Sequence, residues 1–268
     1  MNRRLFLIAA LVSILARAPA NADDPLSGID WYLLPIASAA WIPGGYGSLW
    51  ATELLIRNDS ADSIYLPTPA GTGCVPEACG PEEIAPNKTV QFQQRLPGNT
   101  SEPWNHAVFL YLAKGDRAAL QVTLRIRDVS VDPARLPVEL PLVHSSEFRI
   151  GTIGLLDVPT RPGTRTLIRI FVRPTNASDI FRFKIETYDS ALDVPLETAE
   201  VATRAGDDRP LARWATTLQW APTNVATRGL RVVIAELGHE TPFWAFATTT
   251  DNLTQEIALT TPQLRYVP

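Results

Sequence analysis

The chain has three histidines, and one of them lies beside hydroxyl groups, since His144 precedes Ser145 and Ser146. Hydrolysis by a serine nucleophile needs a base within hydrogen-bond reach and a third group that orients that base. Adjacent residues on a strand point to opposite faces, so this neighbourhood is not by itself a catalytic dyad. The sequence also contains no G-x-S-x-G elbow. We therefore predict that His106, His144 and His239 are turn or surface residues and that the protein is not an enzyme. Paired carboxylates stay open, because their spacing is spatial.

The two cysteines, Cys74 and Cys79, are separated by four residues. In an oxidising compartment such a pair closes a small disulfide loop. A redox pair usually has the spacing C-x-x-C, and a zinc site needs more ligands than three scattered histidines supply. The acidic pair Asp207-Asp208 does not fit a calcium loop of the D-x-D-x-D-G kind. We predict a structural disulfide, no metal and no cofactor.

Four aromatic residues in loops are candidates for ligand contact, namely Trp41, Tyr46, Trp104 and Trp220. Such rings form a stacking platform for sugars or anchor a protein partner, or alternatively they close the open ends of a sandwich. Tyr46 lies in a glycine-rich segment that we interpret as a sharp turn and not as a phosphate loop, because a strand pattern and not a helix follows it. The other tryptophans sit within or beside apolar alternation and are expected in the core: Trp31, Trp50, Trp214 and Trp244.

The amino terminus has the pattern of a secretory signal peptide over residues 1–22. Arg3 and Arg4 precede the apolar run Leu5–Leu15, and Ala20-Asn21-Ala22 forms an A-x-A cleavage pattern. Cleavage removes three arginines and no acidic residue, so the net charge changes from −4 to −7. The run is too short to span a bilayer, and we expect no membrane span in the mature protein. The acidic balance also argues against a nucleic-acid partner. We predict an exported protein, periplasmic or extracellular.

The elements that position these residues are short alternating segments. The 268 residues contain 23 prolines and 15 glycines, a composition that disfavours helices. β-branched and aromatic residues alternate with polar ones in runs bounded by Pro, Gly, Asn and Asp. We therefore expect an all-β protein of antiparallel sandwiches. The predicted strands are Trp50–Arg57, Thr89–Gln93, Val108–Ala113, Leu120–Asp128, Thr166–Arg173, Phe181–Tyr188, Glu197–Thr203, Leu230–Glu236, Phe243–Thr250 and Glu256–Thr261.

A weak internal repeat divides the chain in two. Leu55–Tyr65 aligns with Phe171–Phe181 without a gap, at a shift of 116 residues. Phe109–Asp128 aligns with Val232–Asp251, and each is a strand, a glycine turn and a second strand that ends in aspartate. A period near 120 residues matches an immunoglobulin-type sandwich. We predict a first sandwich domain over residues 23–135 and a second over residues 136–268.

The segments LLPIASAAWIPGGYGSLWATELLIRNDS and ELPLVHSSEFRIGTIGLLDVP resemble secreted bacterial proteins with tandem Ig-like sandwiches. The resemblance implies the fold and export, and no particular activity. The layout is also similar to periplasmic pilus chaperones, which are pairs of Ig domains with a basic cleft. We predict a non-catalytic interaction or structural protein that binds a protein or a cell-surface polysaccharide. The alternatives are a carbohydrate-binding module that uses the loop tryptophans and an Ig-pair chaperone.

Overall fold

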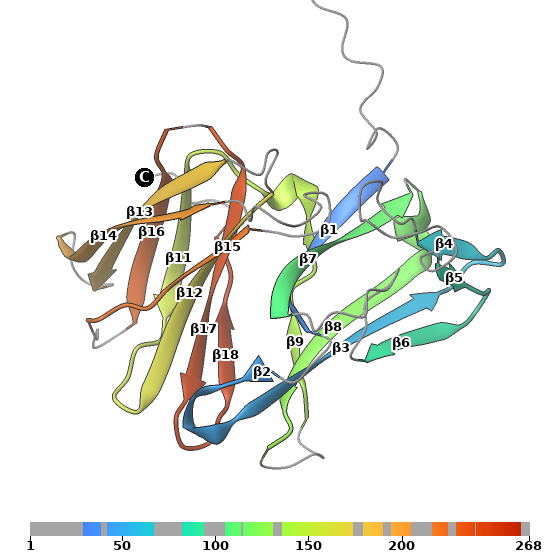
Figure 1. Ribbon diagram of the computed structural model, residues 1–268, viewed down its shortest axis with the longest axis horizontal. Helices are drawn as coiled ribbons and strands as arrows, with labels where there is room; N and C mark the ends of the chain where they lie inside the picture. The colour runs from blue at the N-terminus through green and yellow to red at the C-terminus, as the bar shows by residue number, and fades with distance from the viewer. Residues whose placement is uncertain are drawn as a thin grey trace, which may run out of the picture.

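The computed structural model describes residues 29–38, 42–66, 82–93, 105–113, 115–130, 136–173, 179–189, 194–204, 216–224, 229–238 and 240–263. The predicted signal peptide, the predicted disulfide between Cys74 and Cys79, and the predicted contact residues Trp41 and Trp104 lie outside these ranges. The described residues form strands and short 3-10 turns (Figure 1), which confirms the all-β prediction.

The amino-terminal half comprises the strands up to residue 144. They are β1 (Ile29–Ser38), β2 (Ile42–Pro43), β3 (Leu49–Asn58), β4 (Ile64–Leu66), β5 (Glu82–Ile84), β6 (Thr89–Gln93), β7 (Asn105–Ala113), β8 (Leu120–Asp128), β9 (Val138–Leu140) and β10 (Val143–His144). Two 3-10 turns lie between these strands, η1 (Gly45–Gly47) and η2 (Asp116–Ala119), and a third, η3 (Ser145–Glu147), follows β10.

The carboxy-terminal half comprises the strands from residue 152 onward. They are β11 (Thr152–Val158), β12 (Thr164–Val172), β13 (Ile180–Asp189), β14 (Pro195–Arg204), β15 (Thr216–Trp220), β16 (Leu230–Glu236), β17 (Phe243–Asp251) and β18 (Ile257–Thr260).

Each half contains two larger antiparallel sheets, and one strand order is found in both halves. The amino-terminal half also contains the two-stranded sheet of β4 and β5. In the amino-terminal half, β6, β3, β8 and β9 lie side by side with β2 at the other end of β3; we call this the β3 sheet. In the carboxy-terminal half, β15, β12, β17 and β18 follow the same order; we call this the central sheet. The pairing of β1 with β7 is likewise repeated by β11 with β16. The predicted repeat therefore corresponds to matching strands.

The glycine turns of the repeat also match. Gly115 precedes β8 with a φ of 99°, and Gly238 precedes β17 with a φ of 117°, a region that favours glycine because it has no Cβ. β8 ends at Asp128 and β17 ends at Asp251, as the alignment predicts.

The strands of the repeat are distributed differently from those of a constant-type immunoglobulin domain. That domain keeps its first two strands, A and B, in one sheet. Here the first strand, β11, lies in a sheet with β16, β13 and β14, whereas the second, β12, lies in the central sheet with β15, β17 and β18. The immunoglobulin-like part of the prediction is therefore not confirmed.

The segment after the predicted boundary at residue 135 continues the pairing of the amino-terminal half. β9 pairs with β8, and β10 pairs with β1, so residues 138–144 add a strand to each of its two larger sheets. The boundary itself stays a prediction.

Each half has its own apolar core, formed by the alternate residues that face between its sheets. β3 shows the pattern well, since Trp50, Leu54 and Ile56 are buried while their neighbours are partly exposed. Leu124 and Ile126 of β8 join this core from the neighbouring strand. The carboxy-terminal core is built from the same alternation: Ile168, Ile170, Val172, Phe183, Ile185, Val232, Ile234, Phe243 and Ala245.

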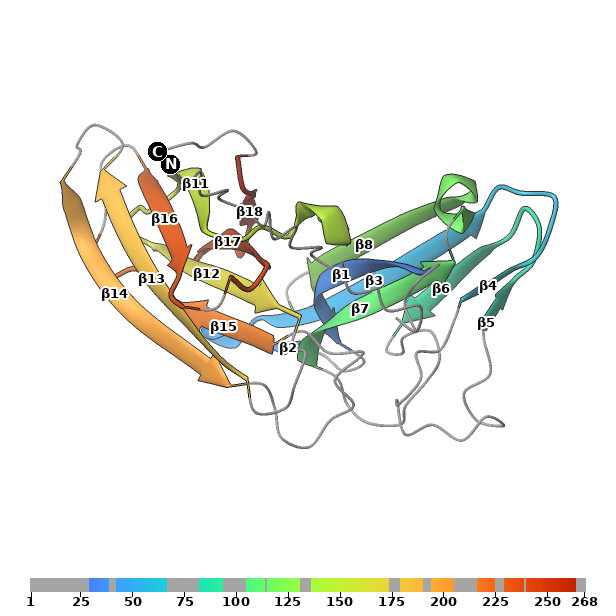
Figure 2. The same cartoon turned by 90° about the horizontal axis from the view of Figure 1, so that it is seen from above.

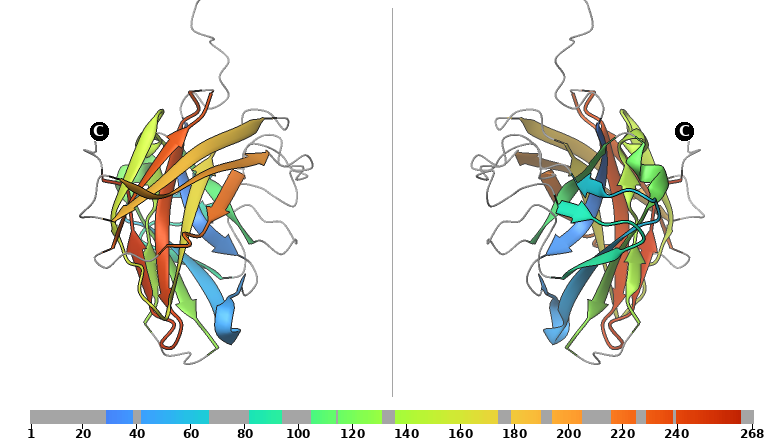
Figure 3. Two further views of the ribbon diagram at one scale, coloured as in Figure 1. Left: turned by 90° about the vertical axis from the view of Figure 1, so that its left-hand side faces the viewer. Right: turned by 90° about the vertical axis from the view of Figure 1, so that its right-hand side faces the viewer.

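A third buried cluster joins the two halves; we call it the interface cluster. The central sheet lies between the amino-terminal half and the other sheet of the carboxy-terminal half, which is formed by β11, β16, β13 and β14 (Figures 2 and 3). We call the face of the central sheet that is turned to the amino-terminal half its outer face. Its outer face contributes Phe171, Trp244 and Phe246, and the stacked rings of Trp244 and Phe246 have centroids 5.3 Å apart. The amino-terminal half contributes Leu33, Ala107, Phe109, Tyr111, Val143 and, after η3, Phe148. Buried aromatic area of this kind holds the halves in a fixed arrangement.

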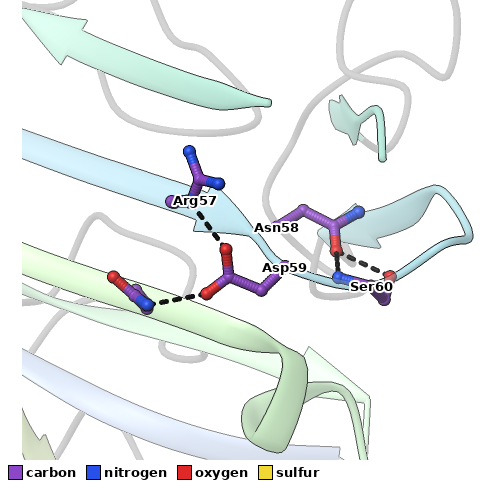
Figure 4. A network of polar contacts seen from close by, with 5 residues as sticks. Arg57, Asn58, Asp59 and Ser60 are labelled. Atoms are coloured by element: carbon purple, nitrogen blue, oxygen red, sulfur yellow. Dashed lines mark hydrogen bonds and ion pairs between the residues drawn. The ribbon is translucent and has the colours of Figure 1, made fainter. Parts of the chain in front are cut away.

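A buried asparagine fixes the corner after β3 (Figure 4). The Asn58 side chain donates hydrogen bonds to the carbonyl oxygens of Asp62 (2.7 Å) and Ile84 (2.8 Å). Its carbonyl oxygen accepts bonds from the backbone N–H and the hydroxyl of Ser60. Beside it, Asp59 accepts from Arg57 at 2.6 Å on the exposed side. All hydrogen-bonding groups of the buried amide are engaged, so this corner is a structural element.

Among the residues described, no helix is long and apolar enough to cross a membrane.

Candidate functional site

A cavity of about 710 Å³ lies where the central sheet meets the amino-terminal half; we call it the junction cavity. Its walls on the amino-terminal side are mainly apolar and include Ile36, Ile42, Trp50 and Ile126. The central sheet contributes polar groups, namely Arg165, Arg169, Thr217, Gln219, Thr248 and Thr250. The volume and the mixed lining are those of a small-molecule or side-chain binding site.

Strand alternation explains why polar residues face this cavity. Ile168 and Ile170 of β12 point into the carboxy-terminal core, so Arg169 between them points to the other face. Arg169 is opposite Gln219 on β15, and both line the cavity. On the same face, Phe171 near the carboxyl end of β12 belongs to the interface cluster, whereas Arg165 and Arg169 nearer its amino end line the cavity.

Arg169 carries an uncompensated charge in this lining. One guanidinium N–H donates to Thr248 Oγ1 at 2.6 Å, and the guanidinium carbon lies 5.9 Å from the Phe246 ring centroid. No carboxylate of the described residues forms an ion pair with it. Burial lowers the pKa of Arg169 to about 10, which still leaves the guanidinium charged at neutral pH. A cation in this position attracts an anion.

Arg165 is positioned differently, because other side chains already engage it. It donates to Asn252 Oδ1 at 2.9 Å and to Gln255 Oε1 at 2.7 Å in the turn between β17 and β18. Its guanidinium carbon also lies 5.5 Å from the Tyr46 ring centroid. Arg165 therefore connects the η1 loop of the amino-terminal half to the β17–β18 turn.

Thr217 supplies a second unsatisfied group. Its Oγ1 is buried and has no hydrogen-bond partner among the described residues, although the side chain lines the cavity. Thr217 lies opposite Phe171 of β12. Phe171 is two residues after Arg169, so Thr217 and Arg169 lie on the same face of the sheet. A buried hydroxyl without a partner is costly, and a rotation of the side chain toward the cavity would let a ligand bond to it and recover that cost.

The wall formed by Trp50 is held by close packing. The indole N–H donates to Ser48 Oγ at 3.0 Å, and Ser48 Oγ donates to the Gly45 carbonyl at 2.8 Å. A Cβ on Gly44 would overlap both the Ser48 hydroxyl and the Trp50 ring. Position 44 therefore requires glycine, and the glycine-rich segment is a close-packed turn, as predicted from the sequence.

The predicted contact residues fall in different surroundings. Tyr46 is 74% exposed and lies under Arg165 at the edge of the cavity, next to Gly44 and Gly45, which line it. Trp220 is paired with Ile168 and packs against the carboxy-terminal core. Trp41 and Trp104 lie outside the described residues. Of the tryptophans expected in the core, Trp50 and Trp244 are buried, and Trp31 is partly buried against the interface cluster. Trp214 lies outside the described residues.

His144 contacts a neighbouring hydroxyl, contrary to the argument from strand geometry. β10 ends at His144 and η3 begins at Ser145, so the backbone turns and brings Ser146 Oγ to 2.7 Å from His144 Nδ1. The same ring nitrogen accepts the Ser146 N–H, and Glu147 accepts the His144 N–H at 3.0 Å. Asp30 Oδ1 is 4.0 Å from Nε2, beyond hydrogen-bond distance. These contacts are those of a capping box around η3.

The groups that face the junction cavity were not identified from the sequence. In a strand that alternates, an arginine between two isoleucines is typical of a solvent-exposed face, and only the contact between the halves buries it. The nearest signal in the sequence was the glycine-rich turn beside Tyr46, which borders the cavity.

The described residues include no cluster of three or more His, Cys, Asp or Glu side chains suited to a metal ion. No family model, curated protein or solved structure matches this chain.

Proposed function

We propose that this chain is an exported, non-catalytic binding protein that holds a segment of a macromolecular partner in the junction cavity. The observation that carries the proposal is the cavity itself, placed between two halves that the interface cluster holds together. A site between fixed elements needs little rearrangement on binding, which favours affinity.

The lining suits binding by its composition. One wall offers apolar side chains, and the opposite wall offers guanidinium, hydroxyl and amide groups. Groups of these kinds orient a ligand through hydrogen bonds while the apolar wall removes its hydrophobic part from water.

Carbohydrate binding is a second candidate, and Tyr46 favours it. Its ring is exposed, and Arg165 lies over one face. The other face is available for stacking with a sugar ring at the edge of the cavity.

We further propose that the two halves are tandem copies of one sandwich unit. The repeated strand order of the β3 sheet and the central sheet supports this, as does the shared turn geometry at Gly115 and Gly238.

A thermal-shift screen of the purified protein against short peptides, oligosaccharides and cell-wall fragments tests the proposed function. A ligand of the folded state raises the apparent stability by about 2.7 kcal/mol at a hundredfold excess over Kd. Ala221→Trp adds a ring at an exposed residue that lines the cavity, and it should abolish the shift. Ala202→Trp, on the exposed strand β14, is the matched control and should retain it. Equal shifts in both variants would place the ligand elsewhere and contradict the proposal.

A further inference from the structure

The chemistry of the junction cavity indicates which group of a ligand it receives; this inference rests on the proposed function. Arg169, Thr217 and Thr248 come from three neighbouring strands, β12, β15 and β17, and all line the cavity. Thr248 already accepts a bond from Arg169, whereas Thr217 Oγ1 has no partner in the described part of the chain. The guanidinium has further N–H groups, and we infer from them that the cavity receives a hydrogen-bond acceptor.

The charge of the site matches a single negative charge. Arg169 is the cation whose described contacts leave most of its donors unused, because Arg165 is engaged by Asn252, Gln255 and Tyr46. One guanidinium balances one carboxylate, and its planar fork matches the two carboxylate oxygens. A dianionic phosphate would leave a second charge partly buried without a partner.

The opposite wall defines what is attached to the carboxylate. Ile36, Ile42, Trp50 and Ile126 offer apolar surface with no side-chain donor free for a ligand, since the Trp50 N–H bonds to Ser48. A sugar acid would place several hydroxyl groups against this wall without partners. An apolar side chain next to the carboxylate fits it.

We propose that the junction cavity binds the carboxyl-terminal residue of a peptide chain, with the carboxylate on Arg169 and Thr217 and an apolar side chain against Trp50 and Ile126. The partner is thus a protein with a free, apolar carboxyl terminus. Thr250 and Gln219 also line the cavity, and their hydroxyl and amide groups are of the kind that bond to a peptide unit.

The test measures binding of a fluorescein-labelled peptide Ala-Ala-Ala-Leu to the full protein by fluorescence anisotropy, as the free acid and as the carboxyl-terminal amide. Charge-assisted hydrogen bonds account for roughly a 10- to 100-fold difference in Kd, so the acid should bind that much more tightly. Arg169→Met should remove this difference by weakening the acid alone. Thr217→Val, which keeps the shape of the side chain, should weaken the acid roughly 3- to 10-fold.

Matched controls separate the site from general effects on charge or folding. Arg182→Met removes an exposed arginine of β13, and Thr198→Val removes an exposed hydroxyl of β14; both should bind like the unaltered protein. Urea unfolding of every variant checks that each one folds. Because Arg169→Met removes a charge without a described ion pair, we expect that variant to fold.

The outcomes distinguish this inference from the proposed function. If the amide binds as tightly as the acid and Ala221→Trp abolishes both, the cavity is a binding site and the carboxylate inference is wrong. The sugar acid trigalacturonate is tested in the same way. If it binds and the peptide does not, and Arg169→Met abolishes its binding, carboxylate recognition by Arg169 is supported and the proposal of a peptide ligand is overturned. If neither ligand binds, the inference fails, and only the broader thermal-shift screen still tests the proposed function. The inference is supported if the free-acid peptide binds tightly, if Arg169→Met loses this binding and if Arg182→Met retains it.

Discussion

The central sheet and the β3 sheet share one strand order, and their outer faces have opposite chemical character. At the repeat's own alignment, Trp244 and Phe246 of β17 correspond to Gln121 and Thr123 of β8, and Arg169 of β12 corresponds to Glu53 of β3. Glu53 is neutralised by Arg127 at 3.1 Å on the β3 sheet, whereas Arg169 faces the cavity without a described carboxylate. The same strand order thus forms a sheet with a charged outer face in the first half. In the second half it forms a sheet that packs against the other half and lines the junction cavity.

The comparison teaches that the contact between the halves, and not the repeated fold, creates the site. The outer face of the β3 sheet carries charged pairs, as expected for a solvated surface. The same face of the central sheet combines aromatic side chains with a cation that has no carboxylate partner among the described residues. Cover by another part of the chain stabilises the aromatic side chains, whereas it carries a cost for the cation.

The largest effect is expected for Trp244→Ala. Trp244 is 3% exposed and stacks on Phe246, so its truncation should lower the free energy of unfolding by about 3–5 kcal/mol. Gln121→Ala, at the aligned position, should change it by about 0.5 kcal/mol or less. Urea denaturation measures both. If the two losses were similar, the outer face of the central sheet would not be covered in solution.

The next effect distinguishes the two aspartates that end β8 and β17. Asp128 is buried and accepts bonds from the Leu49 N–H and from both donors of Ser130. Asp128→Ala should therefore lower the free energy of unfolding by about 1–3 kcal/mol, because it removes three hydrogen bonds that are partly shielded from water. Asp251→Ala should cost less, since the bonds from Leu253 and Thr254 that it removes are exposed to water. An equal or larger loss for Asp251→Ala in the same urea experiment would contradict this ranking.

A smaller effect, which differs between the two halves, is expected for the free energy of unfolding when the aligned charges are removed. Glu53→Gln breaks an ion pair near the surface and should lower the free energy of unfolding by less than about 1 kcal/mol. Arg169→Met replaces a desolvated charge by an apolar side chain and should leave stability unchanged or raise it by up to about 1 kcal/mol. A loss of several kcal/mol for Arg169→Met would show that the guanidinium supports the fold and is not reserved for a ligand.

The smallest effect concerns acid. The backbone N–H groups of Thr254 and Leu253 hold the pKa of Asp251 below its ordinary value of 3.8. A depressed carboxyl pKa contributes stability that is present above the ordinary value and is lost as the pH falls below it. The midpoint temperature of thermal unfolding should therefore fall less steeply between pH 6 and pH 2.5 in Asp251→Asn than in the unaltered protein. Identical slopes would contradict the contribution of this turn.

Most strands could be predicted because their alternation is local. The runs at Thr89–Gln93, Leu120–Asp128 and Leu230–Glu236 coincide with β6, β8 and β16. β1 was missed because Pro35 interrupts its apolar run, and the strand accommodates it with an irregularity between Leu34 and Ala37. β11 and β15 were missed as well. Their sequences, TIGLLDV and TTLQW, lack the regular alternation that marked the other strands.

The site could not be predicted because its signal is not local. The sequence places Arg169 on the polar face of β12, and this is correct for the strand taken alone. Whether that face meets water or another part of the chain depends on how the two halves pack, and alternation carries no information on that. Trp244 was expected in the core, and it is buried; the core in question is the one shared between the halves.

The last strand has a consequence for how the protein forms during translation. Ile257 and Leu259 of β18 pack against the amino-terminal core, although more than a hundred residues separate them from β10. A ribosome releases the chain from its amino terminus, so the first core lacks these contacts until β18 has been made. Until then the aromatic side chains around Phe109 also face water, because Trp244 and Phe246 have not yet been synthesised or have not yet docked. The nascent first half is therefore an incomplete body with an exposed apolar surface, which a holding chaperone can recognise.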